Sequence, residues 1–158
     1  MGPRVDTSMT EDEIHRFLDA PRTGVLSTVG PDGVPHSVGM WFARCGDEIR
    51  MWTYAKSQKA KNVRRSPGVG FLVEEGGTYS ELRGVLVRGD AILLEDQDRV
   101  AEIGRLLYVR YTFPVTGVPV EDGPIEEIRR QATKRIGIAL PLARVVSWDH
   151  GKLGTVPF

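Results

Sequence analysis

Closely spaced turn signals between short apolar segments constrain the fold of this chain most. Residues 23–29 have the pattern of a strand, and residues 34–43 have the pattern of its return strand. Between them, Pro31 presets the bend of a GPDG turn and Gly33 tolerates a positive φ. The CGDE segment at 45–48 turns the chain again into a third strand at 49–54. Strands joined by such short turns pair antiparallel.

The remaining elements complete a barrel-like pattern. Thr10 and Glu13 form a capping box for a helix that ends before Pro21, and Ser57 is the expected N-cap of a helix that ends at Ser66. Further strands are expected at 69–74, at 79–95 as one long strand or a bent pair, and at 136–148 with an interruption at Pro141. Further helices are expected from Asp96 or Asp98 to Tyr111 and at 125–134. Glycines at 84 and 89 suggest bulges or a barrel corner. An antiparallel sheet that avoids free edges closes into a barrel, so we predict an α+β fold, mainly antiparallel β.

Composition excludes several classes of protein. With 158 residues, we expect one domain, 1–158, in which residues 1–9 are flexible. Lysine plus arginine and aspartate plus glutamate number 21 each, which argues against a nucleic-acid binder. The single cysteine, Cys45, allows no disulfide framework. No apolar run suits a membrane span or a signal peptide, so we expect a cytoplasmic protein. The histidines are scattered, and we expect no metal site.

A basic segment at residues 53–67 contains no acidic residue. It carries Lys56, Lys59, Lys61, Arg64 and Arg65. The segment follows a strand and begins a helix, and helix N-termini bind anions such as phosphate. A solvated helix face is the alternative interpretation, and we expect it for the last three of these residues. For Lys59 with the Ser57 hydroxyl we prefer a phosphate site, although the spacing alone leaves both interpretations open.

The sequence contains no persuasive pair of a nucleophile and a general base. Cys45 has no neighbouring histidine, and the carboxylates are not paired in an informative way. An enzyme of this kind relies on a cofactor for its chemistry. Trp41, Trp52 and Trp148 fall near strand ends, where they serve either as core or interface residues or as a flat wall for a planar ring.

Taken together, several segments resemble the pyridoxamine 5'-phosphate oxidase-like split β-barrel proteins. They are GVLSTVGPDGVPHSVGMWFA, EIRMWTYAKSQKAKNVRRSPGVGFLVE, YSELRGVLVRGDAIL and RVVSWDHGKL, which cover about residues 23–153. The likeness is greater to the actinobacterial branch of flavin- and deazaflavin-dependent oxidoreductases. The resemblance implies a split barrel with short peripheral helices and a homodimer with two cofactor sites at the subunit interface.

The resemblance also implies which residues bind the cofactor. Ser57 and Lys59 would hold its phosphate, with Lys56 and Gln58 beside them and Thr53 on the phosphate or ribityl side. The strand before them would follow the ring and chain mainly through backbone groups. Trp148 and Lys152 would reach the cofactor across the dimer. The implied strand residues are His36, Ser37, Val38, Met40 and Trp41.

Departures from the vitamin B6 oxidases narrow the expected function. No arginine follows Arg144, and Gly151 stands where relatives often carry arginine. We therefore do not expect oxidation of pyridoxamine phosphate. The resemblance to the actinobacterial branch implies instead hydride transfer between reduced coenzyme F420 and a small unsaturated or conjugated substrate. The anionic tail of F420 would use Lys61, Arg64 and Arg65 if they face the groove, whereas FMN would leave them idle. An FMN-dependent oxidase or reductase, and a non-catalytic carrier or sensor of F420, FMN or haem, are the alternatives. Tyr79 and His150 are weak candidates for a proton donor, and no nucleic-acid or membrane partner is expected.

Overall fold

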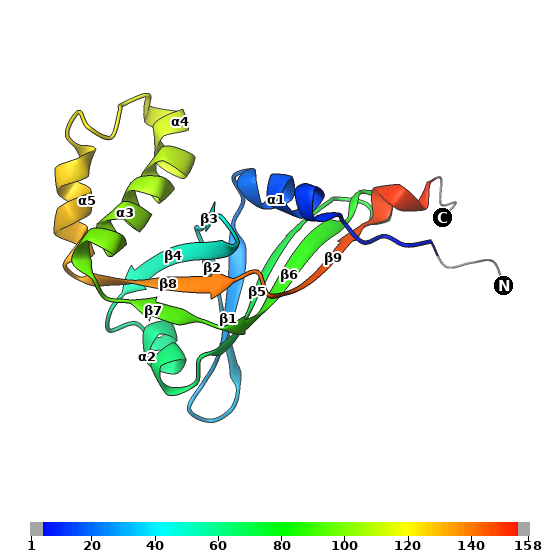
Figure 1. The fold of residues 1–158 in the computed structure, drawn as a ribbon, viewed down its shortest axis with the longest axis horizontal. Coiled ribbons are helices and arrows are strands. Elements are labelled where there is room, and N and C mark those ends of the chain that lie inside the picture. The colour runs from blue at the N-terminus through cyan, green and yellow to red at the C-terminus, as the bar shows by residue number, and fades with distance from the viewer. Residues whose placement is uncertain (1–4, 155–158) are drawn as a thin grey trace.

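Two antiparallel sheets form the frame of the molecule (Figure 1). The computed structural model describes residues 5–154. The first sheet has the order β2-β1-β5-β6-β9 and the second has the order β3-β4-β8-β7. The strands are β1 (Gly24–Val29), β2 (Pro35–Met40), β3 (Ala43–Cys45), β4 (Glu48–Tyr54), β5 (Gly68–Glu75), β6 (Arg83–Asp90), β7 (Ile92–Leu94), β8 (Arg135–Pro141) and β9 (Arg144–Asp149). The predicted α+β fold, mainly antiparallel, is confirmed.

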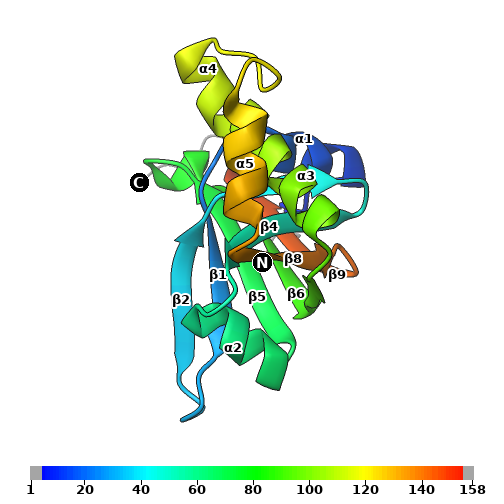
Figure 2. The same ribbon diagram turned by 90° about the vertical axis from the view of Figure 1, so that its left-hand side faces the viewer.

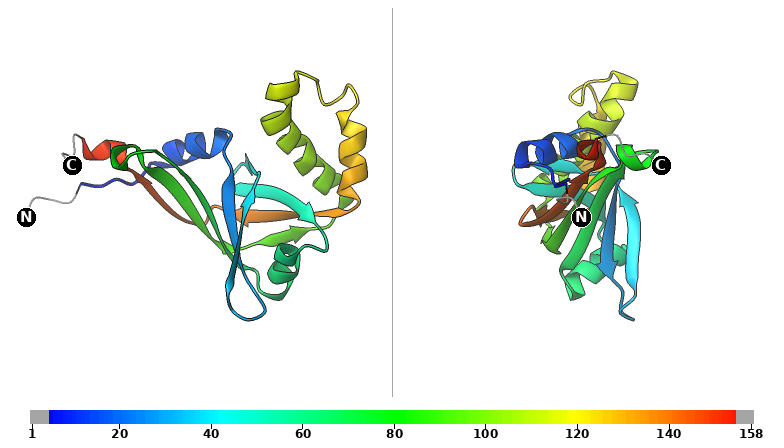
Figure 3. Two further views of the ribbon diagram at one scale, coloured as in Figure 1. Left: turned by 180° about the vertical axis from the view of Figure 1, so that it is seen from behind. Right: turned by 90° about the vertical axis from the view of Figure 1, so that its right-hand side faces the viewer.

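Short helices lie at the margins of the sheets (Figure 2). They are α1 (Glu11–Asp19), α2 (Gln58–Arg65), α3 (Gln97–Leu107), α4 (Phe113–Thr116) and α5 (Pro124–Ala132), with a π-helical turn at Tyr108–Thr112 and 3₁₀ turns at Tyr79–Glu81 and His150–Leu153. The predicted N-caps Thr10, Ser57 and Asp96 each accept a hydrogen bond from a backbone N–H of the following turn. Figure 3 shows α3 and α5 side by side at one end of the molecule and the last 3₁₀ turn at the other.

Three segments predicted as long strands each divide between the two sheets. The return strand at 34–43 leaves the first sheet after Met40 and enters the second at Ala43. The segment at 79–95 is a bent pair that changes sheet at Ala91, and the last strand changes sheet between β8 and β9. Phe42 and Ala91 are buried at two of these corners. Strands that switch sheets in this way join two packed sheets into a split barrel.

Gly84 and Gly89 do not mark bulges, because the β5–β6 register is continuous across both. Gly84 instead gives room to a neighbouring side chain. A Cβ atom at this position would lie 2.4 Å from Cζ2 of Trp148, on the paired strand β9. The glycine therefore allows the indole ring to lie against the sheet.

The first sheet has an apolar inner face and a partly apolar outer face. Leu26, Phe71 and Val85 point inward and belong to the main core, which also contains residues of the second sheet such as Ile138. On the outer face, the register places five small or apolar residues in one row across all five strands. This outer row consists of Gly39, Val25, Leu72, Leu86 and Val146.

The expected flexible start, residues 1–9, is only partly within the described residues, since residues 1–4 lie outside them. The following residues contact β9. The backbone oxygen of Thr7 accepts a hydrogen bond from Asp149 N at 2.8 Å, and Met9 N donates one to Ser147 Oγ at 3.0 Å. Met9 is buried in the core. No helix of residues 5–154 has the length and apolar character needed to cross a membrane.

A buried polar side chain joins α2 to the first sheet. Asn62 is fully buried, and its Nδ2 donates to Thr28 Oγ1 of β1 at 3.0 Å. Its Oδ1 accepts from Gln58 Nε2 at 2.8 Å and from Arg65 NH2 at 3.2 Å. Buried polar groups with all their partners present fix one geometry, and they leave unsatisfied groups when one member is removed.

We predict that Asn62→Leu lowers the free energy of unfolding by about 2 kcal/mol or more, because it removes these bonds without satisfying their partners. Urea denaturation followed by circular dichroism measures the change. Lys61→Leu is the matched control on the exposed side of the same helix, and we expect a change within about 0.5 kcal/mol. Equal stability of the two variants would contradict the structural role of Asn62.

Candidate functional site

Three polar side chains meet where β4 ends and α2 begins. Lys59 Nζ donates to Thr53 Oγ1 at 3.1 Å, and Thr53 Oγ1 donates to Ser57 Oγ at 3.2 Å. Ser57 Oγ also accepts from Ala60 N at 3.3 Å as the helix N-cap. We call Thr53, Ser57 and Lys59 the anion corner. The sequence suggested a phosphate site at Ser57 and Lys59, and the resemblance added Thr53 on the phosphate or ribityl side.

The anion corner offers unused donors and no carboxylate. Ser57 Oγ accepts both of its bonds, so its own proton remains available, and Lys59 Nζ uses one of its three donors on Thr53. The N–H groups of Gln58 and Lys59 occupy the first turn of α2, where no intrahelical acceptor exists. Burial lowers the pKa of Lys59, and no acid compensates its charge. Such a set of donors suits an anionic ligand.

The other basic residues of this segment have different roles. Arg64 forms an ion pair with Glu95 at 2.6 Å. Arg65 donates to the backbone oxygen of Val29 and to Asn62. Lys56 and Lys61 are exposed. Protein acceptors thus engage the guanidinium groups of Arg64 and Arg65 in this structure, and the expected use of both residues for an anionic cofactor tail stays a prediction.

The predicted cofactor strand, β2, is an edge strand of the first sheet. One side of its backbone therefore has no partner strand, which leaves N–H and C=O groups available for a ligand. His36, Val38 and Met40 alternate with the exposed Ser37, and His36 lies opposite Thr28, the residue that Asn62 of α2 contacts. The His36 Nδ1 atom is buried without a hydrogen-bond partner in the described part of the chain. An orphaned buried polar atom beside a free strand edge is consistent with a bound cofactor.

An aromatic pocket lies between β4 and the α3–α5 pair. Its volume is about 290 Å³, and Trp41, Trp52, Gly104 and Ile128 are among its lining residues. Trp41 stacks on Tyr111 with ring centroids 4.7 Å apart and an interplanar angle of 8°. The sequence predicted Trp41 as a cofactor residue but missed the helical wall. Gly104 was the available signal, because a glycine inside a helix often marks close packing. A Cβ atom there would lie 2.6 Å from the Trp52 ring.

The structure does not bring the predicted C-terminal residues to the anion corner within one chain. Trp148 lies on Gly84 of the first sheet, and Lys152 Nζ bonds Glu13 Oε2 and the Ser8 backbone oxygen, both at 2.7 Å. The ammonium charge of Lys152 is thus already paired. Both residues belong to the end of the molecule opposite α2 and α5 (Figure 1). Their expected contribution across a dimer stays a prediction.

The weak proton-donor candidates Tyr79 and His150 contact each other. Their ring centroids lie 4.5 Å apart, and His150 Nδ1 lies 2.9 Å from the Tyr79 backbone oxygen. They belong to the two 3₁₀ turns beyond β5 and β9, at the opposite end of the molecule from α3 and α5, whose residues line the aromatic pocket (Figure 1). Within one chain, neither residue is in a position to serve that pocket.

Comparison with known proteins identifies the family. The family model described as pyridoxamine 5'-phosphate oxidase matches residues 10–138. The chain belongs to this family. Residues 10–138 contain the anion corner, the edge strand β2 and the whole aromatic pocket. No protein of curated function matches the sequence.

Solved structures of the same fold include proteins that are named for different roles. The conserved hypothetical protein Rv2991 from Mycobacterium tuberculosis is 41% identical, with a TM-score of 0.88, and the match covers 100% of this chain and 96% of that one. An F420 reductase is 28% identical, with a TM-score of 0.64 and coverage of 84% and 94%. HutZ, the heme storage protein from Vibrio cholerae, is 16% identical, with a TM-score of 0.65 and coverage of 87% and 94%, and shows the shared fold alone.

Glu11, His15 and Asp47 also converge in this family member, although the sequence led us to expect no metal site. One ligand atom from each lies within 4.8 Å of the others. Glu11 and His15 are four residues apart on α1, so their side chains lie on the same face of the helix. The two carboxylates are exposed, and the cluster lies on the α1 side of the β3–β4 turn rather than at the anion corner.

For the anion corner, we predict that Lys59→Met leaves the ligand-free protein as stable as the wild type or more stable at pH 7. Burial depresses the pKa of Lys59 in the folded state below its unfolded value. The charged form therefore destabilises the fold fully below the folded pKa, and this effect fades as pH rises toward the unfolded pKa. Urea denaturation at pH 7 and pH 10 should show the difference between variant and wild type shrinking with pH.

Lys61→Met on the exposed face of the same helix is the control. It should leave the free energy of unfolding unchanged at both pH 7 and pH 10. A Lys59→Met variant that is clearly less stable than the wild type at pH 7 would mean that the lysine supports the fold instead of a ligand.

Proposed function

We propose that this protein is an oxidoreductase that uses coenzyme F420 to transfer a hydride to a small unsaturated or conjugated substrate. The observation that carries the proposal is the anion corner, in which Lys59 is partly buried, lacks an acidic partner and lies beside the Ser57 hydroxyl at a helix N-terminus. That set of donors suits a phosphate group. The 28% identity to an F420 reductase over 84% of the chain supports the deazaflavin.

Each part of the site has a separate task in this proposal. Thr53, Ser57 and Lys59 hold the cofactor phosphate, and the free edge of β2 offers backbone hydrogen bonds along the cofactor. When bound, the deazaflavin supplies the hydride chemistry. The aromatic pocket holds the acceptor, because the flat rings of Trp41 and Trp52 suit a conjugated substrate and exclude water.

We further propose that the protein is a homodimer whose subunits meet on the outer face of the first sheet. The outer row crosses all five strands, and its members Val25 and Val146 are 39% and 48% exposed in the single chain. A continuous apolar row on an exposed sheet face favours association with a second surface. A twofold arrangement would give two equivalent cofactor sites per dimer.

Cofactor binding tests the proposal directly. We predict that the wild type binds F420 more tightly than FMN and that Lys59→Met weakens F420 binding about tenfold or more, because a charge-assisted bond to the phosphate is lost. Fluorescence titration measures both affinities, and Lys61→Met should bind like the wild type. Oxidation of reduced F420 with a quinone as acceptor then separates an enzyme from a carrier.

Tighter FMN binding would assign the protein to the FMN-dependent oxidases or reductases. Binding of F420 without any turnover would favour a carrier or sensor. Unchanged F420 affinity in Lys59→Met would contradict the assignment of the anion corner.

For the dimer, we predict that Val146→Asp yields a folded monomer, because the carboxylate would be buried without a partner in the interface. Light scattering at micromolar concentration measures the mass. Val115→Asp is the matched control, since Val115 is 84% exposed on α4, away from the first sheet. A Val146→Asp variant that remains dimeric would place the interface elsewhere.

A further inference from the structure

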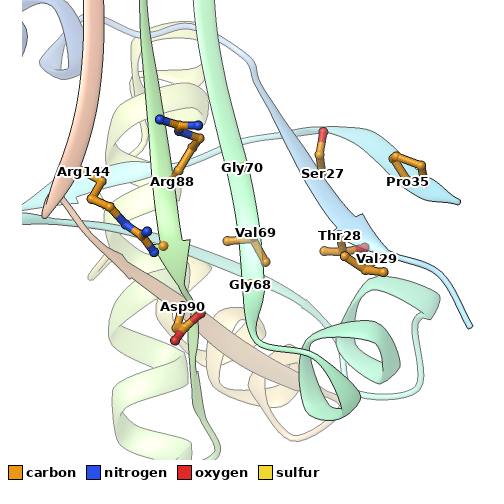
Figure 4. A pocket seen from close by; sticks show the side chains of 11 residues that line it. Ser27, Thr28, Val29, Pro35, Gly68, Val69, Gly70, Arg88, Asp90 and Arg144 are labelled. Atoms are coloured by element: carbon orange, nitrogen blue, oxygen red, sulfur yellow. The ribbon is translucent and has the colours of Figure 1, made fainter. Parts of the chain in front are cut away.

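A second basic site lies on the outer face of the first sheet, in the cross-strand row next to the outer row (Figure 4). In the proposed homodimer it therefore lies beside the subunit interface. It is a hollow of about 410 Å³ across β1, β5, β6 and β9. Gly68 and Gly70 of β5 are among its lining residues, and Arg88 and Arg144 extend from neighbouring strands on one flank. Because these two glycines have no side chains on the outer face, a ligand can approach the backbone closely there.

The two arginines are cross-strand neighbours without acidic partners, and their guanidinium groups point in different directions along the sheet (Figure 4). Arg88 and Arg144 are directly opposite in the β6–β9 register. Within residues 5–154, neither guanidinium group forms an ion pair or a hydrogen bond, whereas Arg44, for example, pairs with Asp19. Like charges directly opposite on a sheet destabilise it. An anion with a charged group at each guanidinium would offset that repulsion.

One acid lines the same hollow. Asp90 lies two residues beyond Arg88 on β6, and no ion pair joins it to either arginine. Its carboxylate gives the hollow one negative charge against two positive ones. The hollow therefore keeps an excess of positive charge, and Asp90 weakens rather than cancels its attraction for an anion.

Size and chemistry indicate the class of ligand. The volume is within the range of small-molecule pockets and exceeds what a single inorganic anion needs. Guanidinium groups bind carboxylates in bidentate geometry, and two adjacent ones match two carboxylates. The Ser27 hydroxyl on the opposite flank adds a polar group.

We propose that Arg88 and Arg144 form a binding site for a small organic anion with at least two carboxylates. The glutamyl tail of the proposed cofactor and a free dicarboxylate are two sources of this chemistry. The first source rests on the proposed function and would replace Arg64 and Arg65, which have protein partners. The second source is independent of it.

The test compares three variants with two kinds of probe. The variants are the double substitution Arg88→Gln with Arg144→Gln, Asp90→Asn, and Arg99→Gln as a control at an exposed position of α3. The probes are glutarate, and F420 with and without its glutamyl tail. Calorimetric titration measures each affinity at low salt, where exposed charges are screened least. Light scattering confirms that all variants keep the oligomeric state of the wild type.

We expect the double variant to bind tailed F420 about tenfold more weakly and to bind the tail-less form like the wild type. Asp90→Asn should tighten binding of the tailed form, and Arg99→Gln should change nothing. Opposite effects of the arginine and aspartate substitutions would distinguish this site from a general loss of structure.

Each of the remaining outcomes supports or overturns the proposed site. Loss of glutarate binding in the double variant, with F420 binding unchanged, supports the site and assigns it to a free dicarboxylate. If wild-type protein binds no F420, the proposed function fails, and the glutarate arm alone decides the site. Glutarate and tailed F420 affinities that are the same in the double variant and the wild type, or absent from the wild type for both probes, overturn the proposal.

Discussion

The hydrogen bonds of Asn62 fix the position of α2, and the candidate cofactor site depends on that position. Asn62 is fully buried and joins the helix to Thr28 of β1, while Gln58 and Arg65 bond the same side chain from within the helix. Since the helix cannot slide along the sheet without breaking these bonds, its N-terminus stays beside the end of β4. A polar contact in the core thus sets the geometry of a site at the surface.

Local signals in the sequence predicted local structure well. The caps at Thr10, Ser57 and Asp96 and the hairpin turn around Gly33 depend on neighbours within a few residues, and all are present. The sheet changes at Phe42 and Ala91 were not predicted. Alternation within one strand does not reveal which distant strand each half will pair with, so a strand that crosses between sheets looks continuous in sequence.

At the candidate site, too, contacts between near neighbours could be predicted and contacts between distant residues could not. Thr53, Ser57 and Lys59 fall within seven consecutive residues, so the sequence could place them together, and the structure does so. The partners of Arg64 and Arg65 could not be inferred, because Glu95 and Val29 come from elements about thirty residues away. Arg88 and Arg144 meet only through the β6–β9 register. Contacts between residues that lie far apart in the chain could not be predicted from the single sequence.

The α3–α5 segment begins and ends on neighbouring strands, because β7 pairs directly with β8. The chain between them is therefore an excursion from one place on the barrel, and doubling the length of such an excursion adds only about 0.6 kcal/mol of loop-closure entropy. This excursion supplies most of the wall of the aromatic pocket but none of the anion corner. Insertion or deletion between β7 and β8 can therefore remodel the aromatic pocket while the barrel keeps the anion corner, so the two candidate sites can change independently in evolution.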